Sequence, residues 1–210
     1  MNKNDIKIRN EVHSRGITAL YHFTSLSNLE SILKNGIISR KILDENNIPY
    51  EYTDDKRLDD NLNASSVSIH GINYSMFKGK IAKLPRRWVI VEIQPSILWT
   101  HRCDFCWINA ADAEILDHCG YRGGPWAFRK MFDDAPVSRT DDSSHRAHYK
   151  TAANSPTFSD AEVQVHGIIS PDLIRDVTIA HECDRKRTEA AMENAKRSLP
   201  IAINPEAFRV

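Results

Sequence analysis

A histidine stands near the end of a β-rich run, just before the chain turns into a helix. Residues 17–24 (ITALYHFT) are apolar, β-branched or aromatic, and this composition predicts a buried strand that carries His22. An imidazole there can hydrogen-bond a ligand's ribose or amide, and the first amides of the following helix suit an anion. Asn28 and Ser31 share a polar face of that helix. A satisfied, half-buried histidine without a ligand is the alternative interpretation.

A glutamate begins another predicted strand. Residues 162–169 (EVQVHGII) alternate in polarity and directly follow the long polar loop 133–160, so Glu162 lies at the head of the strand. A carboxylate on a rigid strand beside a loop can stabilise a cation that develops during a reaction. Glutamates in alternating strands also commonly face solvent, so this residue does not define a site by itself.

A strip of positive charge covers residues 73–87 (NYSMFKGKIAKLPRR). It has five basic residues and no acidic one, and Tyr74 and Phe77 stand among them. Basic side chains neutralise phosphates, and aromatic rings stack on unpaired bases at roughly 1–3 kcal/mol per base. The strip therefore predicts a surface for single-stranded nucleic acid, with a solvated, charged hairpin as the alternative. Its basic residues are Lys78, Lys80, Lys83, Arg86 and Arg87.

Two of the four cysteines form a C-x-x-C pair, Cys103 and Cys106. Such a pair supplies two of the four ligands of a structural zinc ion. The adjacent His118 and Cys119 form a poor second pair, because neighbouring side chains rarely point at one metal. We therefore expect buried, reduced thiols and no metal. A non-catalytic, zinc-containing nucleic-acid-binding module remains an alternative.

Composition places these residues in one ordinary domain. The chain has 210 residues, 28 basic and 28 acidic side chains and 41% apolar residues, which predicts a single domain over 1–210 with its core at about 17–180. Zero net charge excludes a surface that is positive throughout. No apolar run is long enough for a membrane span, and residues 1–15 do not resemble a secretory signal, so we expect a cytoplasmic protein.

The elements occur in mixed order, which favours an α+β fold over a doubly wound sheet. Ser27 and Glu30 have the spacing of a capping box, which predicts a helix over 28–35 that ends at Gly36. There is no G-x-G-x-x-G motif and no P-loop. The expected strands are 17–24, 36–39, 66–72, 87–94, 162–169 and 177–180; the other expected helices are 109–119, 125–132 and the closing 182–199; long loops cover 44–63 and 133–160.

The segment Tyr21–Arg40 (Y-H-F-T-x-x-x-N-L-x-x-I-L-x-x-G-I-I-S-R) resembles the opening signature of the DarT-type ADP-ribosyltransferases, which modify bases of nucleic acids. The resemblance continues in short blocks at 66–68, 73–77, 88–99, 103–109 and 154–163. It implies an enzyme that splits NAD⁺ and attaches ADP-ribose to a base of single-stranded DNA or RNA. Such enzymes are typically toxins of toxin–antitoxin or phage-defence systems, so an antitoxin protein is an expected partner. The implied fold has two small, facing, mainly antiparallel sheets with flanking helices.

The resemblance also implies roles for individual residues. Those expected to bind NAD⁺ are His22, Phe23, Thr24, Ser31 and Ser39, with Tyr74 holding the nicotinamide flat. Glu162 matches the catalytic glutamate, and Arg57 is the candidate for an arginine that orients the target. Loop 133–160 presents the base.

The implied chemistry suits a glutamate. Breaking the nicotinamide–ribose bond develops an oxocarbenium cation, and a carboxylate that holds the ribose 2′-hydroxyl stabilises charge where it appears. A protein-modifying ADP-ribosyltransferase uses the same NAD⁺ chemistry and is the second alternative.

Overall fold

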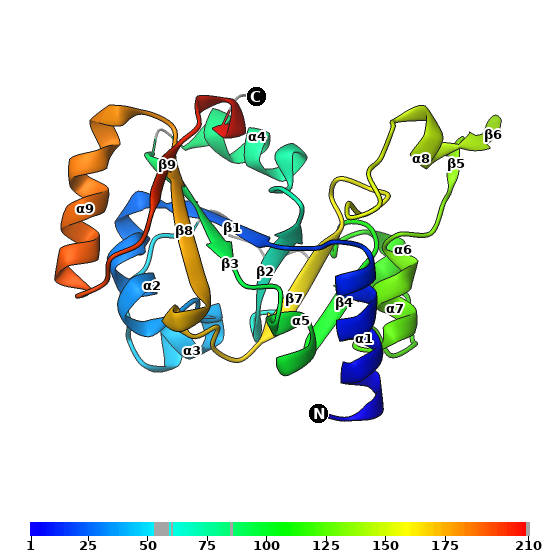
Figure 1. Ribbon diagram of the computed structural model, residues 1–210, viewed down its shortest axis with the longest axis horizontal. Coiled ribbons are helices and arrows are strands. Elements are labelled where there is room, and N and C mark those ends of the chain that lie inside the picture. The colour runs from blue at the N-terminus through cyan, green and yellow to red at the C-terminus, as the bar shows by residue number, and fades with distance from the viewer. Residues whose placement is uncertain (53–58, 60, 85, 209–210) are drawn as a thin grey trace.

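The computed structural model describes residues 1–52, 59, 61–84 and 86–208, with helices packed on both faces of a central sheet (Figure 1). The helices are α1 (Lys3–Ser14), α2 (Leu29–Asn35), α3 (Arg40–Glu45), α4 (Tyr74–Lys83), α5 (Ile97–Thr100), α6 (Ala113–Leu116), α7 (Pro125–Lys130), α8 (His145–His148) and α9 (Arg185–Asn194). The strands are β1 (Leu20–Ser25), β2 (Ala64–Ile69), β3 (Trp88–Ile93), β4 (Cys103–Cys106), β5 (Pro136–Ser138), β6 (Asp141–Ser144), β7 (Glu162–His166), β8 (Ile174–Ile179) and β9 (Ile201–Ile203).

The central sheet of the described residues has the strand order β4-β7-β2-β1-β3-β8-β9. Its neighbours pair antiparallel except β8 and β9, which are parallel. β1 pairs with β3 over six residues but with β2 at two positions, Leu20–Ile69 and Tyr21–Ser68. The α+β, mainly antiparallel fold is confirmed. The two expected sheets are the halves β4-β7-β2 and β1-β3-β8-β9, joined by that short pairing into one sheet.

Alternation along β3 shows how the two faces are covered. Val89 and Val91 point into the larger core, which also contains side chains of α1, α2 and α7. Trp88 and Ile90 point to the other face, where a smaller cluster gathers beneath α4. Successive strand residues face opposite sides, so this one strand contributes to both cores.

The basic strip is a helix and not the hairpin that the sequence offered as an alternative. Asn73 caps α4, because its Oδ1 accepts the Met76 N–H at 3.0 Å. Phe77 is fully buried beneath the helix, and its ring lies edge-on to Phe23 (5.0 Å) and Trp88 (5.5 Å). This aromatic anchor fixes α4 against β1 and β3.

Several expected elements differ at their ends. The capping box at Ser27 and Glu30 does not form, because a 3₁₀ turn over Leu26–Asn28 precedes α2 and Ser27 Oγ bonds Ser25 Oγ at 2.7 Å. The expected strand at 36–39 is a single bridge between Ile37 and Ile169. The expected helix 109–119 shrinks to α6, the closing helix 182–199 to α9, and loop 133–160 contains the β5–β6 hairpin and α8. Within the described ranges, no helix has both the length and the apolarity to cross a lipid bilayer.

Two carboxyl groups lie side by side on the sheet. Glu92 on β3 pairs directly with Asp176 on β8, and Tyr21 on β1 flanks Glu92. Burial raises the pKa of both Glu92 and Asp176, and the Asp176 charge raises the pKa of Glu92 further. In the folded state both acids therefore hold their protons to higher pH than in the unfolded chain. Their ionisation opposes folding as pH rises through the range above their ordinary values.

We expect Glu92→Gln to raise the melting temperature at pH 7, because it removes a group whose ionisation opposes folding. About 1 kcal/mol corresponds to roughly 2–4 °C in a chain of this size. The difference in melting temperature between Glu92→Gln and the wild type narrows as pH falls toward and below 4.5, the ordinary pKa of a glutamate. At that pH Glu92 becomes protonated in both the folded and the unfolded state. Thermal melts from pH 4 to pH 8 test this, with Glu193→Gln on exposed α9 as the charge-matched control. A difference that stays constant across pH contradicts the prediction.

Candidate active site

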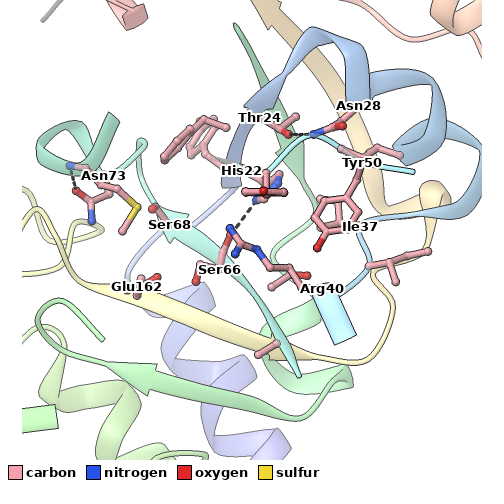
Figure 2. A pocket seen from close by; sticks show the side chains of 18 of the residues that line it. His22, Thr24, Asn28, Ile37, Arg40, Tyr50, Ser66, Ser68, Asn73 and Glu162 are labelled. Atoms are coloured by element: carbon pink, nitrogen blue, oxygen red, sulfur yellow. Dashed lines mark hydrogen bonds between the residues drawn. The ribbon is translucent and has the colours of Figure 1, made fainter. Parts of the chain in front are cut away.

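The described residues enclose a cavity of about 320 Å³ between β1, β2, β7 and the helices α2, α3 and α4 (Figure 2). This volume is at the lower end of ordinary ligand sites, roughly 300–1,000 Å³. His22 and Glu162, the first two candidates from the sequence, both line this cavity. Other lining residues include Tyr21, Phe23, Thr24, Ser31, Arg40, Tyr50, Glu51, Tyr52, Asp59, Ser66, Ser68, Lys80, Asn109 and Ala111.

His22 is held in one orientation by the backbone of the next strand. Its Nδ1 lies 2.9 Å from the carbonyl oxygen of Ser66 on β2. A carbonyl oxygen only accepts, so Nδ1 carries a proton and donates this hydrogen bond. β1 and β2 do not pair directly at this point, and the imidazole bridges them (Figure 2).

Glu162 is buried and fixed by a backbone donor. Its side chain is 5% exposed, and Oε1 accepts the N–H of Ala110 at 3.0 Å. That N–H belongs to the turn after β4, which Asn109 closes by accepting the Ala111 N–H at 2.9 Å. The carboxylate therefore faces the cavity in a defined orientation, on a strand that is paired on both edges.

A small cluster on α6 and α7 holds this turn in place. The indole N–H of Trp107 donates to Glu114 Oε1 at 2.6 Å, and Lys130 Nζ lies 3.3 Å from the same oxygen. Lys130 also lies 3.8 Å from the centre of the Trp107 indole. The Trp107 hydrogen bond lowers the pKa of Glu114. The cluster thus fixes both ends of the segment that presents the Ala110 N–H to the catalytic candidate.

The segment 50–52 closes the cavity on the side of α2. The Asn28 amide accepts the Glu51 N–H at 2.8 Å and donates to the Glu51 carbonyl at 2.8 Å and to Thr24 Oγ1 at 3.0 Å. The Tyr50 and Tyr52 rings lie 6.0 Å apart. The Arg40 guanidinium lies 5.4 Å from the Tyr52 ring centre. This wall offers aromatic faces and a cation, which suit a nucleotide.

Asp59 is a further acid of the cavity wall, beside the strand that carries Glu162. Asp59 lines the cavity, and its Oδ2 accepts the side-chain N–H of Gln164 at 2.5 Å. Gln164 lies two residues after Glu162 on β7, is almost fully buried, and also accepts from Asn61 at 2.8 Å. The strand that carries Glu162 therefore also anchors the chain at Asp59.

The profile of the DarT family, described as ssDNA thymidine ADP-ribosyltransferase, matches residues 21–209. The chain belongs to the DarT family. This confirms the resemblance of the opening block and makes the chain an NAD⁺-dependent ADP-ribosyltransferase.

Solved DarT structures share the fold. Thermus sp. 2.9 DarT in complex with carba-NAD⁺ superposes with a TM-score of 0.62 at 10% identity, over 91% of this chain and 98% of that one. The same protein in complex with ADP-ribosylated ssDNA gives 0.57 at 10% identity, over 92% and 97%. Thermosipho africanus DarTG in complex with ADP-ribose gives 0.59 at 14% identity, and the match spans 91% of this chain but 51% of that one. No curated protein sequence matches the chain.

The other residues expected to bind NAD⁺ differ in whether their side chains line the cavity. Ser31 lines the cavity. Phe23 also lines it, although its ring packs on Phe77 and Trp88 and so mainly anchors α4. Ser39 is buried at the start of α3, and its Oγ has no hydrogen-bond partner within the described part of the chain.

Two expected positions do not join this cavity. Tyr74 is 43% exposed at the start of α4 and lines a different cavity from the one that His22 and Glu162 line. Arg57 lies outside the described residues.

The five basic residues of the strip differ in their surroundings. Lys78 and Lys83 are exposed on α4, while Lys80 lines the cavity. Arg86 donates to the Tyr52 carbonyl at 2.8 Å, and Arg87 lies 3.6 Å from Asp184. Arg86 and Arg87 thus contact neighbouring segments, although the Arg87 side chain is also 55% exposed, whereas the three lysines belong to α4.

Cys103 and Cys106 do not form a metal knuckle. Both are buried on β4, three residues apart, so they point to opposite faces of the strand. Burial raises the pKa of each thiol to about 12, and the nearby Glu162 charge contributes to the shift at Cys106. Across the described ranges, no group of three or more His, Cys, Asp or Glu side chains is arranged to hold a metal ion. The zinc-module alternative thus has no ligand set there.

We expect Glu114→Leu to lower kcat about three- to tenfold while the KM for NAD⁺ stays unchanged. Loss of one hydrogen bond worth about 1 kcal/mol loosens the turn that orients Glu162 through Ala110. Glu114→Gln keeps an acceptor for Trp107 and is the matched control, with near-normal kcat. Steady-state kinetics of both variants test this. Equal losses in both variants, or a change in KM alone, contradict it.

Proposed function

We propose that this chain transfers ADP-ribose from NAD⁺ to a base of single-stranded DNA, which the family description indicates to be thymidine. One observation carries the proposal most directly. The buried Glu162 carboxylate and the His22 imidazole line the same cavity, and each is oriented by a backbone hydrogen bond. A nucleotide-sized ligand held between a fixed acid and a fixed imidazole is what the reaction requires.

Glu162 is assigned to the ribose. Its carboxylate accepts the 2′-hydroxyl and stabilises the oxocarbenium cation that develops as the nicotinamide leaves. Burial strengthens this electrostatic effect, because the site has a lower effective dielectric constant than water. His22 is assigned to the dinucleotide, because its ring is oriented by the bond from Nδ1 to Ser66 and lines the cavity, where an imidazole can hydrogen-bond a hydroxyl or an amide. Arg57 is proposed to orient the target base.

Single-stranded DNA fits the chain better than a duplex. Modifying a base requires access to an atom that a duplex hides, and an unpaired strand avoids unstacking costs of a few kcal/mol. The exposed Lys78 and Lys83 on α4 stand beside the cavity that their neighbour Lys80 lines. A small basic patch of this kind suits a short single-stranded footprint.

We expect Lys78→Ala combined with Lys83→Ala to weaken DNA binding and to reduce its dependence on salt. Each phosphate contact to a single strand contributes about 0.7 to the slope of log K against log [salt], so loss of two contacts lowers the slope by about 1.4. The control is Lys3→Ala with Lys7→Ala, two exposed lysines on α1. Fluorescence anisotropy across a salt titration measures both. Equal slopes in the two double variants contradict the prediction.

We further propose that the chain is a cytoplasmic toxin with an antitoxin partner. It matches 51% of the Thermosipho africanus DarTG chain, so that relative contains a further half beyond the shared domain. Unregulated modification of DNA arrests replication, and a cell that keeps such an enzyme needs an opposing protein. Inducible expression in a bacterium tests this. Growth arrest with the wild type and normal growth with Glu162→Gln is the expected result.

Mass spectrometry of defined oligonucleotides tests the central proposal. Separate pools of single-stranded DNA, duplex DNA, RNA and protein are incubated with the enzyme and NAD⁺. We expect ADP-ribose on single-stranded DNA. Modification of RNA alone, or of protein alone, would replace the proposal with the corresponding alternative.

A further inference from the structure

The transfer of ADP-ribose to thymine releases a proton, and neither Glu162 nor His22 is assigned to accept it. In thymidine the ring nitrogen N1 carries the deoxyribose, so N3, which bears a hydrogen, is the ring nitrogen that is left to form a new bond. When N3 bonds C1′ of the NAD⁺ ribose, nicotinamide leaves with the electron pair of its bond to C1′, and N3 loses its proton. A positioned side chain that accepts such a proton typically accelerates the step by about 10²–10⁴-fold.

The described cavity wall contains three carboxylates and the His22 imidazole as groups that can accept a proton near neutral pH. Glu162 is assigned to the ribose and His22 to the dinucleotide. Glu51 accepts a hydrogen bond from the Ser25 hydroxyl at 2.7 Å, which lowers the pKa of the Glu51 carboxyl and makes it a weaker base. Among the described lining residues, the carboxylate that remains is Asp59.

Asp59 is anchored to the strand that carries Glu162. Its Oδ2 accepts the side-chain N–H of Gln164 at 2.5 Å, and Gln164 accepts from Asn61 at 2.8 Å. Residues two apart on a strand face the same side, so Gln164 and Glu162 share one face of β7, with Cα atoms about 6.6 Å apart. Gln164 is 1% exposed, so this anchor is shielded from water. An ionised carboxylate offers about four acceptor positions, so it can hold Gln164 and accept a proton as well.

The Cys106 thiol lies near both carboxylates. Cys106 on β4 pairs in register with Glu162 on β7. Burial raises the pKa of this thiol to about 12, and the charges of Glu162, Asp104 and Asp59 raise it further. Arg122 Nη1 lies 3.8 Å from Cys106 Sγ, and its positive charge lowers the same pKa. The charges of Glu162 and Asp59 thus act on one thiol, which places both acids at the same end of the cavity.

We propose that Asp59 is the group that accepts the N3 proton of the acceptor thymine, while Glu162 stabilises the ribose cation. This role of Asp59 rests on the proposed function, because it completes that transfer. Glycoside hydrolases that invert configuration hold two carboxyl groups about 6.5–9.5 Å apart, with room for the nucleophile beside the one that takes its proton. Nicotinamide leaves as a neutral molecule and needs no proton, so here the other carboxylate stabilises the cation. Asp59 returns its proton to solvent after each transfer.

Asp59→Asn tests this role, because asparagine has the same shape and keeps an oxygen that accepts the Gln164 N–H. The matched control is Asp104→Asn. Asp104 pairs in register with Gln164 on β7, but its Oδ2 lies 2.8 Å from His166 Nε2 and it is outside the described cavity wall. Single-turnover transfer to a single-stranded oligodeoxynucleotide is measured across neutral and alkaline pH. A second oligonucleotide has 5-fluorouracil, whose N3–H is more acidic, in place of the acceptor thymine. Affinity for carba-NAD⁺ shows whether each variant keeps the cavity.

We expect Asp59→Asn to lower the transfer rate at neutral pH by about 10²-fold or more, with unchanged carba-NAD⁺ affinity. The rate of this variant rises about tenfold per pH unit, because the thymine must then ionise without help, and the loss is smaller on the 5-fluorouracil strand. Asp104→Asn follows the wild-type pH profile on both strands.

A wild-type rate in Asp59→Asn, or an equal loss on both strands at every pH, overturns the role of Asp59 and leaves the proposed function in place. An equal loss of that kind would mean that Asp59 only holds the segment in place, because a structural contact does not respond to the acidity of the acceptor. Failure of the wild-type enzyme to modify either strand overturns the proposed function and the role of Asp59 together.

Discussion

Glu162→Gln lowers the rate of ADP-ribosyl transfer by about 10³-fold and leaves the fold intact. The glutamine amide has the same shape and keeps an oxygen to accept the Ala110 N–H, so the buried contact at 3.0 Å survives. What is lost is the negative charge at the ribose, where the cation develops. Removing one preorganised electrostatic partner of a transition state typically costs about 10²–10³ in kcat, and a full charge in a buried site lies at the upper end of that range.

The measurement is single-turnover transfer to an oligonucleotide at saturating NAD⁺, together with the melting temperature and the affinity for carba-NAD⁺. We expect the rate to fall while the other two stay close to wild type, because the interaction is made mainly in the transition state. Glu189→Gln on exposed α9 is the control for a change of charge. Full activity in Glu162→Gln would remove the carboxylate from the mechanism.

The parts of the site that the sequence predicts are those that depend on local pattern. A β-rich run places His22 on a strand, and an alternating run places Glu162 at the head of another. Gly36 ends the predicted helix because only a residue without a side chain tolerates its φ of +90° with ease. In each case the deciding information lies within about ten residues.

The parts that the sequence does not predict depend on contacts between distant segments. The Ala110 N–H that holds Glu162 lies 52 residues away, and the Asn28 contacts that bring Glu51 to the cavity span 23 residues. The sequence predicts a helix over 109–119 and does not indicate the turn at Asn109, whose next residue holds Glu162 through its N–H. Tyr50 and Tyr52 fall in an acidic, turn-rich stretch and show no periodicity. Sequence patterns therefore find the two candidate residues, His22 and Glu162, and miss the wall around them.

The α4 helix shows how charge can hide an apolar pattern. Phe77, Ile81 and Leu84 recur at helical spacing and pack into the smaller core. Three lysines and Gly79 between them lower the mean hydropathy, so the segment resembles a solvated strip. Tertiary packing on Phe23 and Trp88 decides the structure. The lysines that carry the predicted charge are thus mounted on a rigid element beside the cavity.

The second large effect is expected at Gly36, where the backbone of segment 21–40 meets the residues that follow β7. Gly36 has φ +90°, and a Cβ built on it would lie 2.3 Å from the carbonyl oxygen of Ile169. The next residue, Ile37, exchanges two backbone hydrogen bonds with Ile169, each 3.0 Å long. Ile169 follows β7, the strand that begins with Glu162. The close approach at Gly36 therefore fixes the cavity wall at Gly36 and Ile37 relative to β7, the strand that carries Glu162.

Gly36→Ala is expected to destabilise the chain by about 3 kcal/mol or more. Alanine at positive φ is strained by roughly 1–2 kcal/mol, and relief of the clash with the Ile169 carbonyl requires loss of at least one of the two backbone bonds, which leaves buried groups unpaired. Gly79→Ala is the control, because Gly79 lies inside α4 with nothing within 4 Å of the added Cβ and gains roughly 0.5–1 kcal/mol. Urea unfolding of both variants gives the two free energies. Opposite signs are expected, since the same added methyl group meets backbone at one position and open space at the other.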